Sequence, residues 1–423
     1  MKTNRLCPGF LLGLCLIYTA GYSQQEPVIA STVNTVVIPA TETEPAEAEE
    51  EKQEGPAFTF SGSVDTYFHS SFGTTNAAFG GINAPASAFS DLKGFGLGMA
   101  NLIASYSGDK VGFTADLVFG PRGRAAVFTS QQGIINQMYA FYKLTDKVTL
   151  NLGQFNTFLG YEVISPAVNF HYSTSYMFSY GPFSHTGLRA DFDLGGGMVA
   201  KLAVMNPTDL VEFNPINTYT LGGQIGHAND AGGVWLNFIY GDQDGDLSAE
   251  DDPYLYDEDG NTIGFISSSG SLFQVDLTTG WNLGEKFYLG LNTTYQTVDA
   301  GESFIAEGDL QDANGDAATF MGVALYPKIT LSETFALGLR AEYLQVTNGH
   351  LGIFGTDEQD LSGNEIGKAN VMELTLSGNY KVGGLTFIPE FRIDKTSENS
   401  FSDKNGKATD MMPSLNLAAV YKF

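Results

Sequence analysis

The chain has very little cysteine, and the position of its cysteines excludes most thiol chemistry. Cys7 and Cys15 are the only two in 423 residues. Both lie in an apolar run near the N-terminus, Leu6 to Ala20, which follows two basic residues. Such a run is typical of a cleaved secretory signal, here residues 1–23. The exported chain then has no thiol, which excludes disulfides and thiolate metal sites.

Long hydrophobic runs and positive charge are also scarce. A membrane-spanning helix needs roughly 18 to 20 consecutive apolar residues, and no such stretch follows the signal. Only 16% of residues are charged, and 21 Lys and Arg stand against 48 Asp and Glu, for a net charge of −27. Nucleic acid is therefore not an expected partner. If the exported chain enters a membrane, it does so through β-strands.

Glycine and aromatic residues are abundant instead. The 50 Gly, 31 Phe and 20 Tyr favour pleated strands joined by turns. Residues 24–56 differ, since they hold eight Glu, one Lys, four Pro and no aromatic residue. This segment cannot bury enough apolar surface to offset its chain entropy. We therefore expect a disordered acidic leader in the periplasm over residues 24–56.

The C-terminus has the pattern of a membrane strand. Leu415, Leu417, Ala419, Tyr421 and Phe423 share one face at a period of two. A last strand of this kind needs a partner strand and an apolar medium, and a closed barrel in a bilayer provides both. The ending resembles the signal by which bacterial outer-membrane barrels are recognised for assembly, with Tyr421 and Phe423 as its expected residues. The alternative is an ordinary edge strand that ends in Phe.

Connections between the candidate strands alternate in length along residues 57–423. Short turns such as Thr145–Lys147 and Gly195–Gly197 alternate with long segments such as Asn156–Ser184 and Gly241–Gly270. The count is about sixteen strands, and both termini lie on the rim of the short turns. The sequence thus predicts an all-β fold, a transmembrane antiparallel up-and-down β-barrel with short periplasmic turns and long extracellular loops. A soluble sandwich or a β-solenoid does not predict this asymmetry.

If the apolar strand positions face lipid, the polar positions between them face the lumen. Such a lining fits a water-filled interior, although ion pairs within the wall would explain any single residue equally well. Arg340 with Glu342 and Glu390 with Arg392 have the spacing of wall bracing. The predicted pore-lining or constriction residues are Glu162, His171, His185, Arg189, Asp191, Lys201, Arg340, Glu342, Glu390 and Arg392.

Short Gly-rich motifs follow one another within Gly153 to Phe192. They are Gly153-Gln154-Phe155, Gly160-Tyr161-Glu162, Asn169-Phe170 with Ser173 and Ser175, Gly181-Pro182-Phe183, and His185-Thr186-Gly187. In this order they resemble the central signature of the OmpL-like β-barrel porins, and the resemblance extends loosely from Phe58 to Phe423. It implies a Gram-negative outer-membrane porin for passive diffusion of small hydrophilic solutes, without defining the solute. The acidic leader is not part of this pattern.

Several partners follow from a porin of this kind. Outer-membrane lipids, lipopolysaccharide, the barrel-assembly machinery and small hydrophilic solutes are the expected partners, and no cofactor is expected. The assembly state stays open between a monomer and a homotrimer. The N-terminus is expected in the periplasm.

The connection 156–184 is the predicted constriction. It is too rich in Phe and Tyr to extend freely into water, so we expect it to fold into the barrel. Glu162 and His171 or His185 would then lie near the path, opposite basic groups such as Arg189 or Arg340. The alternative is that the segment packs at the extracellular rim as a lid or a subunit contact.

Other patterns carry less weight. Asp242, Asp244 and Asp246 cluster oxygen ligands suited to Ca²⁺, but their glycine is misplaced for an EF-hand, which favours a solvated acidic loop. The five His and many Ser form no G-x-S-x-G or H-E-x-x-H motif, so no enzyme is expected. The alternative function is a non-conducting adhesin or surface-binding barrel that uses its acidic extracellular loops.

Overall fold

The computed structural model describes most of the region predicted as a barrel. The described residues are 57–78, 81–82, 93–127, 133–214, 217–243, 254–256, 262–265, 271–298, 317–347 and 368–423. The predicted signal, residues 1–23, and the predicted leader, residues 24–56, lie outside this part of the chain.

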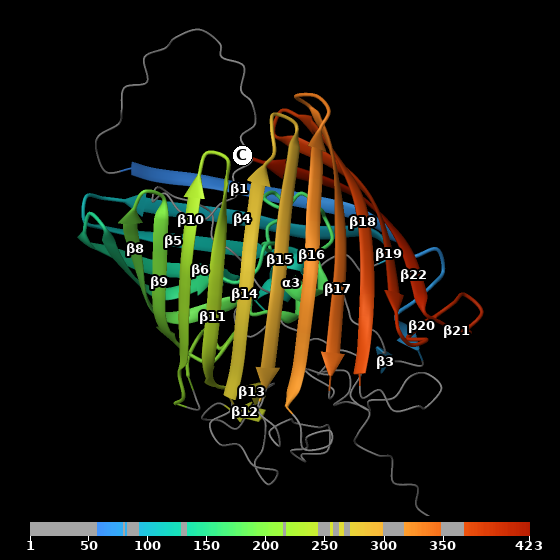
Figure 1. The fold of residues 1–423 in the computed structure, drawn as a ribbon, viewed down its shortest axis with the longest axis horizontal. Coiled ribbons are helices and arrows are strands. Elements are labelled where there is room, and N and C mark those ends of the chain that lie inside the picture. The colour runs from blue at the N-terminus through green and yellow to red at the C-terminus, as the bar shows by residue number, and fades with distance from the viewer. Residues whose placement is uncertain are drawn as a thin grey trace, which may run out of the picture.

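Sixteen antiparallel strands close into one barrel (Figure 1). Consecutive barrel strands pair with each other, and the last strand pairs with the first. The barrel strands are β1 (Ala57–Ser70), β4 (Gly94–Ser107), β5 (Val111–Phe119), β6 (Ile135–Thr145), β7 (Val148–Asn156), β8 (Ser184–Gly195), β9 (Met198–Met205), β10 (Thr220–Asn229), β11 (Gly232–Asp242), β14 (Ser271–Asn282), β15 (Phe287–Val298), β16 (Ala318–Thr330), β17 (Phe335–Thr347), β18 (Lys368–Val382), β19 (Leu385–Thr396) and β22 (Met411–Lys422). The predicted up-and-down barrel is confirmed.

Small elements occupy the longer connections. Three two-stranded sheets pair β2 (Ala77–Ala78) with β3 (Gly81–Ile82), β12 (Tyr254–Tyr256) with β13 (Thr262–Phe265), and β20 (Phe401–Ser402) with β21 (Ala408–Thr409). The described helices are α2 (Gly120–Ala126) and α3 (Tyr176–Tyr180). Neither helix has the length and hydropathy of a membrane span.

The last strand closes the barrel against the first one. The N–H of Phe423 donates to the Gly62 carbonyl at 3.0 Å, and the N–H of Gly62 donates to the Phe423 carbonyl at 3.1 Å. The rings of Phe60 and Phe423 lie 6.3 Å apart on the outer surface. The terminal strand therefore has β1 as its neighbour, as its alternating pattern predicts.

Alternation along the strands separates an apolar outer face from a polar inner one. On β22, Leu417 and Tyr421 are 49% and 45% exposed, whereas the inward Ser414 and Asn416 are 3% and 1% exposed. Outward positions on the other strands are likewise mostly Phe, Leu, Val and Tyr. An outer surface of this kind is stable in hydrocarbon and not in water.

Turn geometry distinguishes the two rims. Gly196 and Gly197 join β8 to β9 with φ angles of +62° and +80°, the left-handed pair that a two-residue hairpin turn requires and glycine accepts without strain. Long connections such as 157–183 leave the opposite rim. The predicted alternation of short and long connections is confirmed.

Candidate functional site

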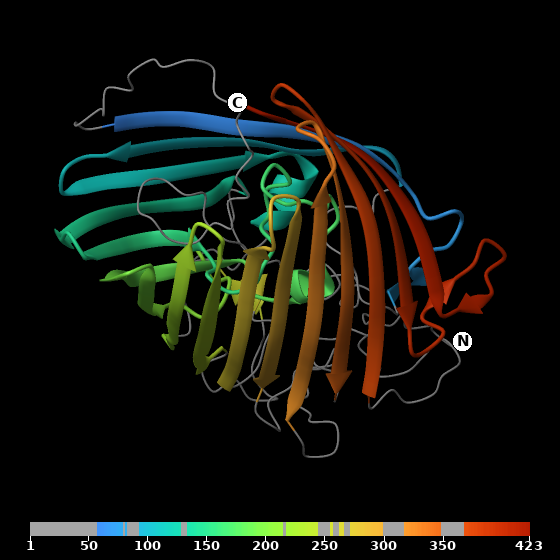
Figure 2. The same cartoon turned by 45° about the horizontal axis from the view of Figure 1, so that its top comes forward.

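The connection between β7 and β8, residues 157–183, crosses the barrel interior. The N–H of Gly160 donates to Asp276 Oδ1 on β14 at 3.0 Å, and the N–H of Tyr172 donates to Glu390 Oε2 on β19 at 2.8 Å. In the order of strands around the barrel, β17 to β19 lie opposite β7 and β8. Figure 2 shows this segment and α3 within the ring of strands. We call residues 157–183 the inner loop.

Carboxylates of the wall bind backbone N–H groups of the inner loop. Glu342 on β17 accepts from the N–H groups of Tyr176 and Met177, both at 2.7 Å. These groups begin α3 and have no acceptor within the helix, so a carboxylate there satisfies them and stabilises the helix terminus. Ser175 caps the same helix, because its Oγ accepts from the Phe178 N–H at 3.1 Å.

Glu390 on β19 binds the preceding turn of the inner loop. It accepts from the N–H groups of Tyr172 at 2.8 Å and Ser173 at 3.1 Å. The Ser377 hydroxyl and the Asn416 amide donate to the same carboxylate, each at 2.9 Å. This buried carboxylate thus has four donors, which offset the cost of removing its charge from water.

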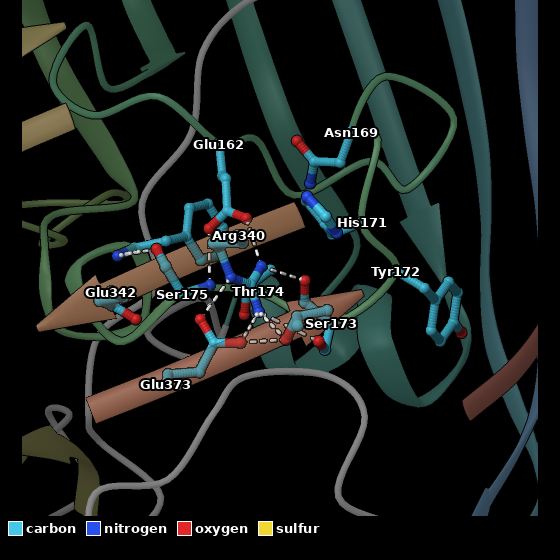
Figure 3. A network of polar contacts seen from close by, with 12 residues as sticks. Glu162, Asn169, His171, Tyr172, Ser173, Thr174, Ser175, Arg340, Glu342 and Glu373 are labelled. Carbon is cyan, nitrogen blue, oxygen red and sulfur yellow. Dashed lines mark hydrogen bonds and ion pairs between the residues drawn. The ribbon is translucent and has the colours of Figure 1, made fainter. Parts of the chain in front are cut away.

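Arginines of the wall bind the carbonyl groups of the inner loop. Arg340 on β17 is fully buried, with Nη1 2.6 Å from Glu162 Oε1 and Nε 2.9 Å from Glu373 Oε2 (Figure 3). Its Nη1 also donates to the Ser173 carbonyl at 2.7 Å. Arg392 on β19 likewise donates to the Thr174 carbonyl at 2.7 Å. Each buried guanidinium therefore has acceptors on the inner loop, as a stable buried charge requires.

Aromatic packing completes the contact. Tyr161 stacks on Tyr326 with ring centroids 4.0 Å apart, and its hydroxyl lies 2.8 Å from that of Tyr288. Inward glycines give the inner loop its room. A Cβ on Gly322 would lie 2.5 Å from Sδ of Met177. The wall is therefore shaped to receive the inner loop.

Six of the predicted site residues meet in this contact. Glu162 and His171 lie on the inner loop, and the wall contributes Arg340, Glu342, Glu390 and Arg392, all of them buried. In the folded chain these six residues hold the inner loop in place. Their part in lining a water-filled path stays a prediction.

His171 is buried in this contact and lies within hydrogen-bond distance of the wall. Its Nδ1 lies 2.8 Å from the Ser377 hydroxyl. Burial and the nearby Arg340 guanidinium hold the pKa of His171 well below its usual range. This histidine therefore adds no positive charge to the lumen at neutral pH.

The other four predicted residues lie on β8 and β9. Arg189 Nε is 2.9 Å from Asp191 Oδ1, and Lys201 stands opposite Asp191 in the strand register. His185, at the start of β8, packs against the Phe158 ring at 5.7 Å. The structure therefore joins Arg189, Asp191 and Lys201 in one cluster, and the Phe155 ring lies between Arg189 and His185, 4.5 Å from the guanidinium and 6.2 Å from the imidazole.

Several carboxylates that contact the inner loop or its partners were not predicted as site residues, among them Glu373, Asp276 and Asp209. Asp276 accepts the hydrogen bond from the Gly160 N–H. Its inward position on β14, between two apolar outward residues, could have been predicted from the period-two pattern. Asp209, in the connection 206–219, accepts from the N–H groups of Phe183 and Ser184 at 2.9 and 2.7 Å. Burial raises the pKa of Asp209 to about 7, against these two hydrogen bonds, which lower it. No local pattern marks Asp209, because its partners are distant in sequence.

The proposed calcium ligands are only partly within the described residues. Asp242 ends β11, whereas Asp244 and Asp246 lie outside the described part of the chain. Calcium binding there stays a prediction.

Comparison with solved structures shows the same fold. The outer membrane channel DcaP of Acinetobacter baumannii superposes with a TM-score of 0.52 at 15% identity, over 88% of this chain and 98% of that chain. An anion-selective porin from Comamonas acidovorans has a TM-score of 0.53 at 10% identity, over 87% and 100%. The trimer form of OmpT of Vibrio cholerae has a TM-score of 0.52 at 11% identity, over 88% and 100%.

A family model shows which family the sequence belongs to. No curated protein matches the chain. A model described as "Putative beta-barrel porin-2, OmpL-like" matches residues 57–423, the whole span of the barrel. The family and its fold place the chain in the outer membrane. The chain therefore belongs to the OmpL-like family of β-barrel porins.

Proposed function

We propose that the protein is a channel for passive diffusion of small hydrophilic solutes across the outer membrane. The observation that carries this proposal is the closed barrel of sixteen strands with an apolar outer face and a polar inner face. A barrel of this strand number is too wide for its own side chains to fill, so water occupies what the inner loop leaves open. Membership in a porin family supports the same function.

The inner loop is the proposed constriction. It crosses from β7 and β8 to the wall formed by β17 to β19 and is fixed there by Glu342, Glu390, Arg340 and Arg392. A segment held by this many buried contacts reduces the open cross-section permanently and does not move aside as each solute passes. The cluster of Arg189, Asp191 and Lys201 lies on the opposite wall, and we assign it to the lining of the remaining path.

The orientation and assembly follow from the same architecture. The short turns and both ends of the barrel domain belong to the periplasmic rim in this proposal, and the long connections to the outer surface. The barrel is assigned no catalytic role. A homotrimer is the proposed assembly, in line with the trimer form of one structural neighbour.

Liposome swelling tests the proposed function. Vesicles with the folded barrel should swell in solutions of small neutral sugars at rates that fall steeply with sugar size, and protein-free vesicles should not. Absence of swelling with any sugar, when the inserted protein is folded by circular dichroism, would contradict the proposal. A barrel that binds a surface ligand without admitting sugars would support the adhesin alternative.

A further inference from the structure

A buried lysine lies on the short-turn side of the inner loop. Lys328 is 6% exposed, at an inward position of β16 close to the turn that leads into β17. Its Nζ lies 4.9 Å from the ring centroid of Tyr288 and 5.9 Å from that of Phe170. Among the described residues, no carboxylate forms an ion pair with Lys328. Two ring faces replace only part of the hydration that a buried ammonium loses.

A glycine lets the Phe170 ring lie against the wall beside Lys328. Gly338 stands opposite Lys328 in the register of β16 and β17. A Cβ at this glycine would lie 2.3 Å from Cε1 of Phe170, so the ring covers bare backbone there. The Asn379 amide donates to the Phe170 carbonyl at 2.9 Å and fixes that residue. Phe170 and Tyr288 therefore form rigid apolar walls beside the ammonium.

A second lysine acts on the same space. Lys381 on β18 has an inward position, since its neighbours Tyr380 and Val382 are 48% and 52% exposed on the outer face. Its backbone N–H donates to the Thr334 carbonyl at 2.9 Å, in the turn that follows β16. The exposed side chain of Lys381 therefore lies at the same rim as Lys328, and the two positive charges act on each other. Two ammonium groups of this kind repel each other, and an anion between them would relieve the repulsion.

The inward carboxylates of the same strands are already engaged. Glu342 accepts from the N–H groups at the start of α3, and Glu373 is paired with Arg340. The remaining charged inward positions of β15 to β18 in the described residues are the two lysines. The nearby carboxylates of the short turns, Glu285 and Glu333, form no ion pair with either lysine among the described residues.

We propose that Lys328 and Lys381 form a subsite for a small organic carboxylate within the channel. The two ammonium groups would bind the carboxylate, and the rings of Phe170 and Tyr288 would pack against its apolar part. The subsite rests on the proposed function, because its ligand arrives through a water-filled lumen. It adds a solute class to that function, because the channel would bind small organic anions briefly on the short-turn side of the inner loop.

Calorimetric titration of the folded full chain in detergent tests the subsite, with benzoate as the probe. Wild-type protein should bind benzoate saturably and should not bind neutral benzyl alcohol. Lys328→Met should weaken benzoate binding by about tenfold or more, because it removes a charge-assisted contact. Lys381→Gln should weaken binding by a smaller factor, and Lys328→Arg should retain it within about threefold.

A matched control uses a lysine on the other rim. Lys395 forms an exposed pair with Asp410, Nζ to Oδ2 2.5 Å, near the end of β19, and its side chain lies on the outer face of the barrel. Lys395→Met should bind benzoate as wild type does. The Lys328→Met chain should still fold, because the change removes an unpaired buried cation and leaves an apolar chain of similar length.

The outcomes separate the subsite from the channel itself. Benzoate binding that Lys328→Met leaves unchanged, or wild-type protein that does not bind benzoate, would overturn the subsite even if the barrel admits sugars. Lysine-dependent binding by a barrel that admits no sugar would support the subsite's chemistry and overturn the proposed channel.

Discussion

At the scale of single residues, the inner loop is held by buried charges that each have several partners. Arg340 bonds both to the wall, through Glu373, and to the inner loop, through Glu162 and the Ser173 carbonyl. Removing one member of such a group leaves the others buried without a counter-charge, which is far more costly than losing an exposed pair.

Arg340→Met should therefore destabilise the barrel by about 3 to 5 kcal/mol and release the inner loop. Equilibrium unfolding in urea measures the first effect, and limited proteolysis within residues 157–183 measures the second. Lys395→Met, at the exposed pair with Asp410, should cost at most about 1 kcal/mol and leave the proteolysis pattern unchanged. Equal effects of the two substitutions would contradict the role of Arg340 in holding the inner loop to the wall.

Asp209 gives the structure a pH dependence of known sign. Its pKa is raised by burial to about 7 in the folded chain, against about 3.9 for an unfolded aspartate. Between these values the folded chain holds a proton that the unfolded chain has released. The contribution of this group to stability is thus complete below about pH 4 and is lost as the pH rises through about 7.

Asp209→Asn should remove this dependence, because the amide oxygen can still accept from the N–H groups of Phe183 and Ser184. Wild-type stability should fall between pH 4 and 7 by up to about 1.4 kcal/mol per pH unit more than that of the variant. Urea unfolding at a series of pH values measures both slopes. Identical slopes would show that Asp209 is ionised throughout.

Residue roles were the hardest part to predict from sequence. The period-two pattern gives the inward direction of Arg340 and Glu390, because it needs only local information. The pairing of Arg340 with Glu162 and Glu373 depends on where the inner loop crosses, which no local pattern contains. The sequence pairs Arg340 with Glu342, but Glu342 caps α3 in the structure.

At the scale of elements, the inner loop and the terminal strand each support a prediction. The ends of the inner loop lie close together, since the N–H of Thr157 donates to the Phe183 carbonyl at 3.0 Å. A short Gly-Ser linker can therefore replace residues 165–180 without stretching the barrel. The backbone pairing of the sixteen strands does not include these residues.

The shortened inner loop should let larger sugars through. Liposome swelling should then be detected with trisaccharides that the wild-type barrel excludes, because the proposed constriction is gone. Replacing the connection 403–407 between β20 and β21 with a linker is the matched control, and its size limit should equal that of wild type. An unchanged limit in the shortened inner loop would contradict the constriction.

Phe423 is the proposed end of the assembly signal. Its N–H and carbonyl close β22 on Gly62, and its ring lies beside that of Phe60. Deleting Phe423 should lower the fraction of protein that reaches the outer membrane, as measured by heat-modifiable migration of membrane fractions. The protein that does assemble should admit the same sugars as wild type. Normal assembly of the shortened chain would contradict this role.

Strand order was predictable because membrane strands obey strict rules. Alternation fixes the two faces, and the short and long connections fix the direction of each strand, so the closure of β22 on β1 follows. Residues 120–126 and 176–180 form short helices within connections, which a period-two search does not detect. Residues 157–183 form a long connection rich in Phe and Tyr, and this composition predicted that the segment folds into the barrel.

At the scale of the whole molecule, the inner loop crosses a polar barrel interior and is fixed to the wall. Charge is distributed unevenly around it. The carboxylates and arginines pair with each other where the inner loop contacts the wall. Lys328 and Lys381 lie on the short-turn side of the inner loop.

Single-channel recording in planar bilayers tests the central claim most directly. Purified barrel, folded by circular dichroism, should give discrete conductance steps in potassium chloride, and the barrel with the linker in place of residues 165–180 should give larger steps. Silence of both proteins after verified insertion would contradict a water-filled channel. Equal steps from both would retain the channel but contradict its narrowing by the inner loop.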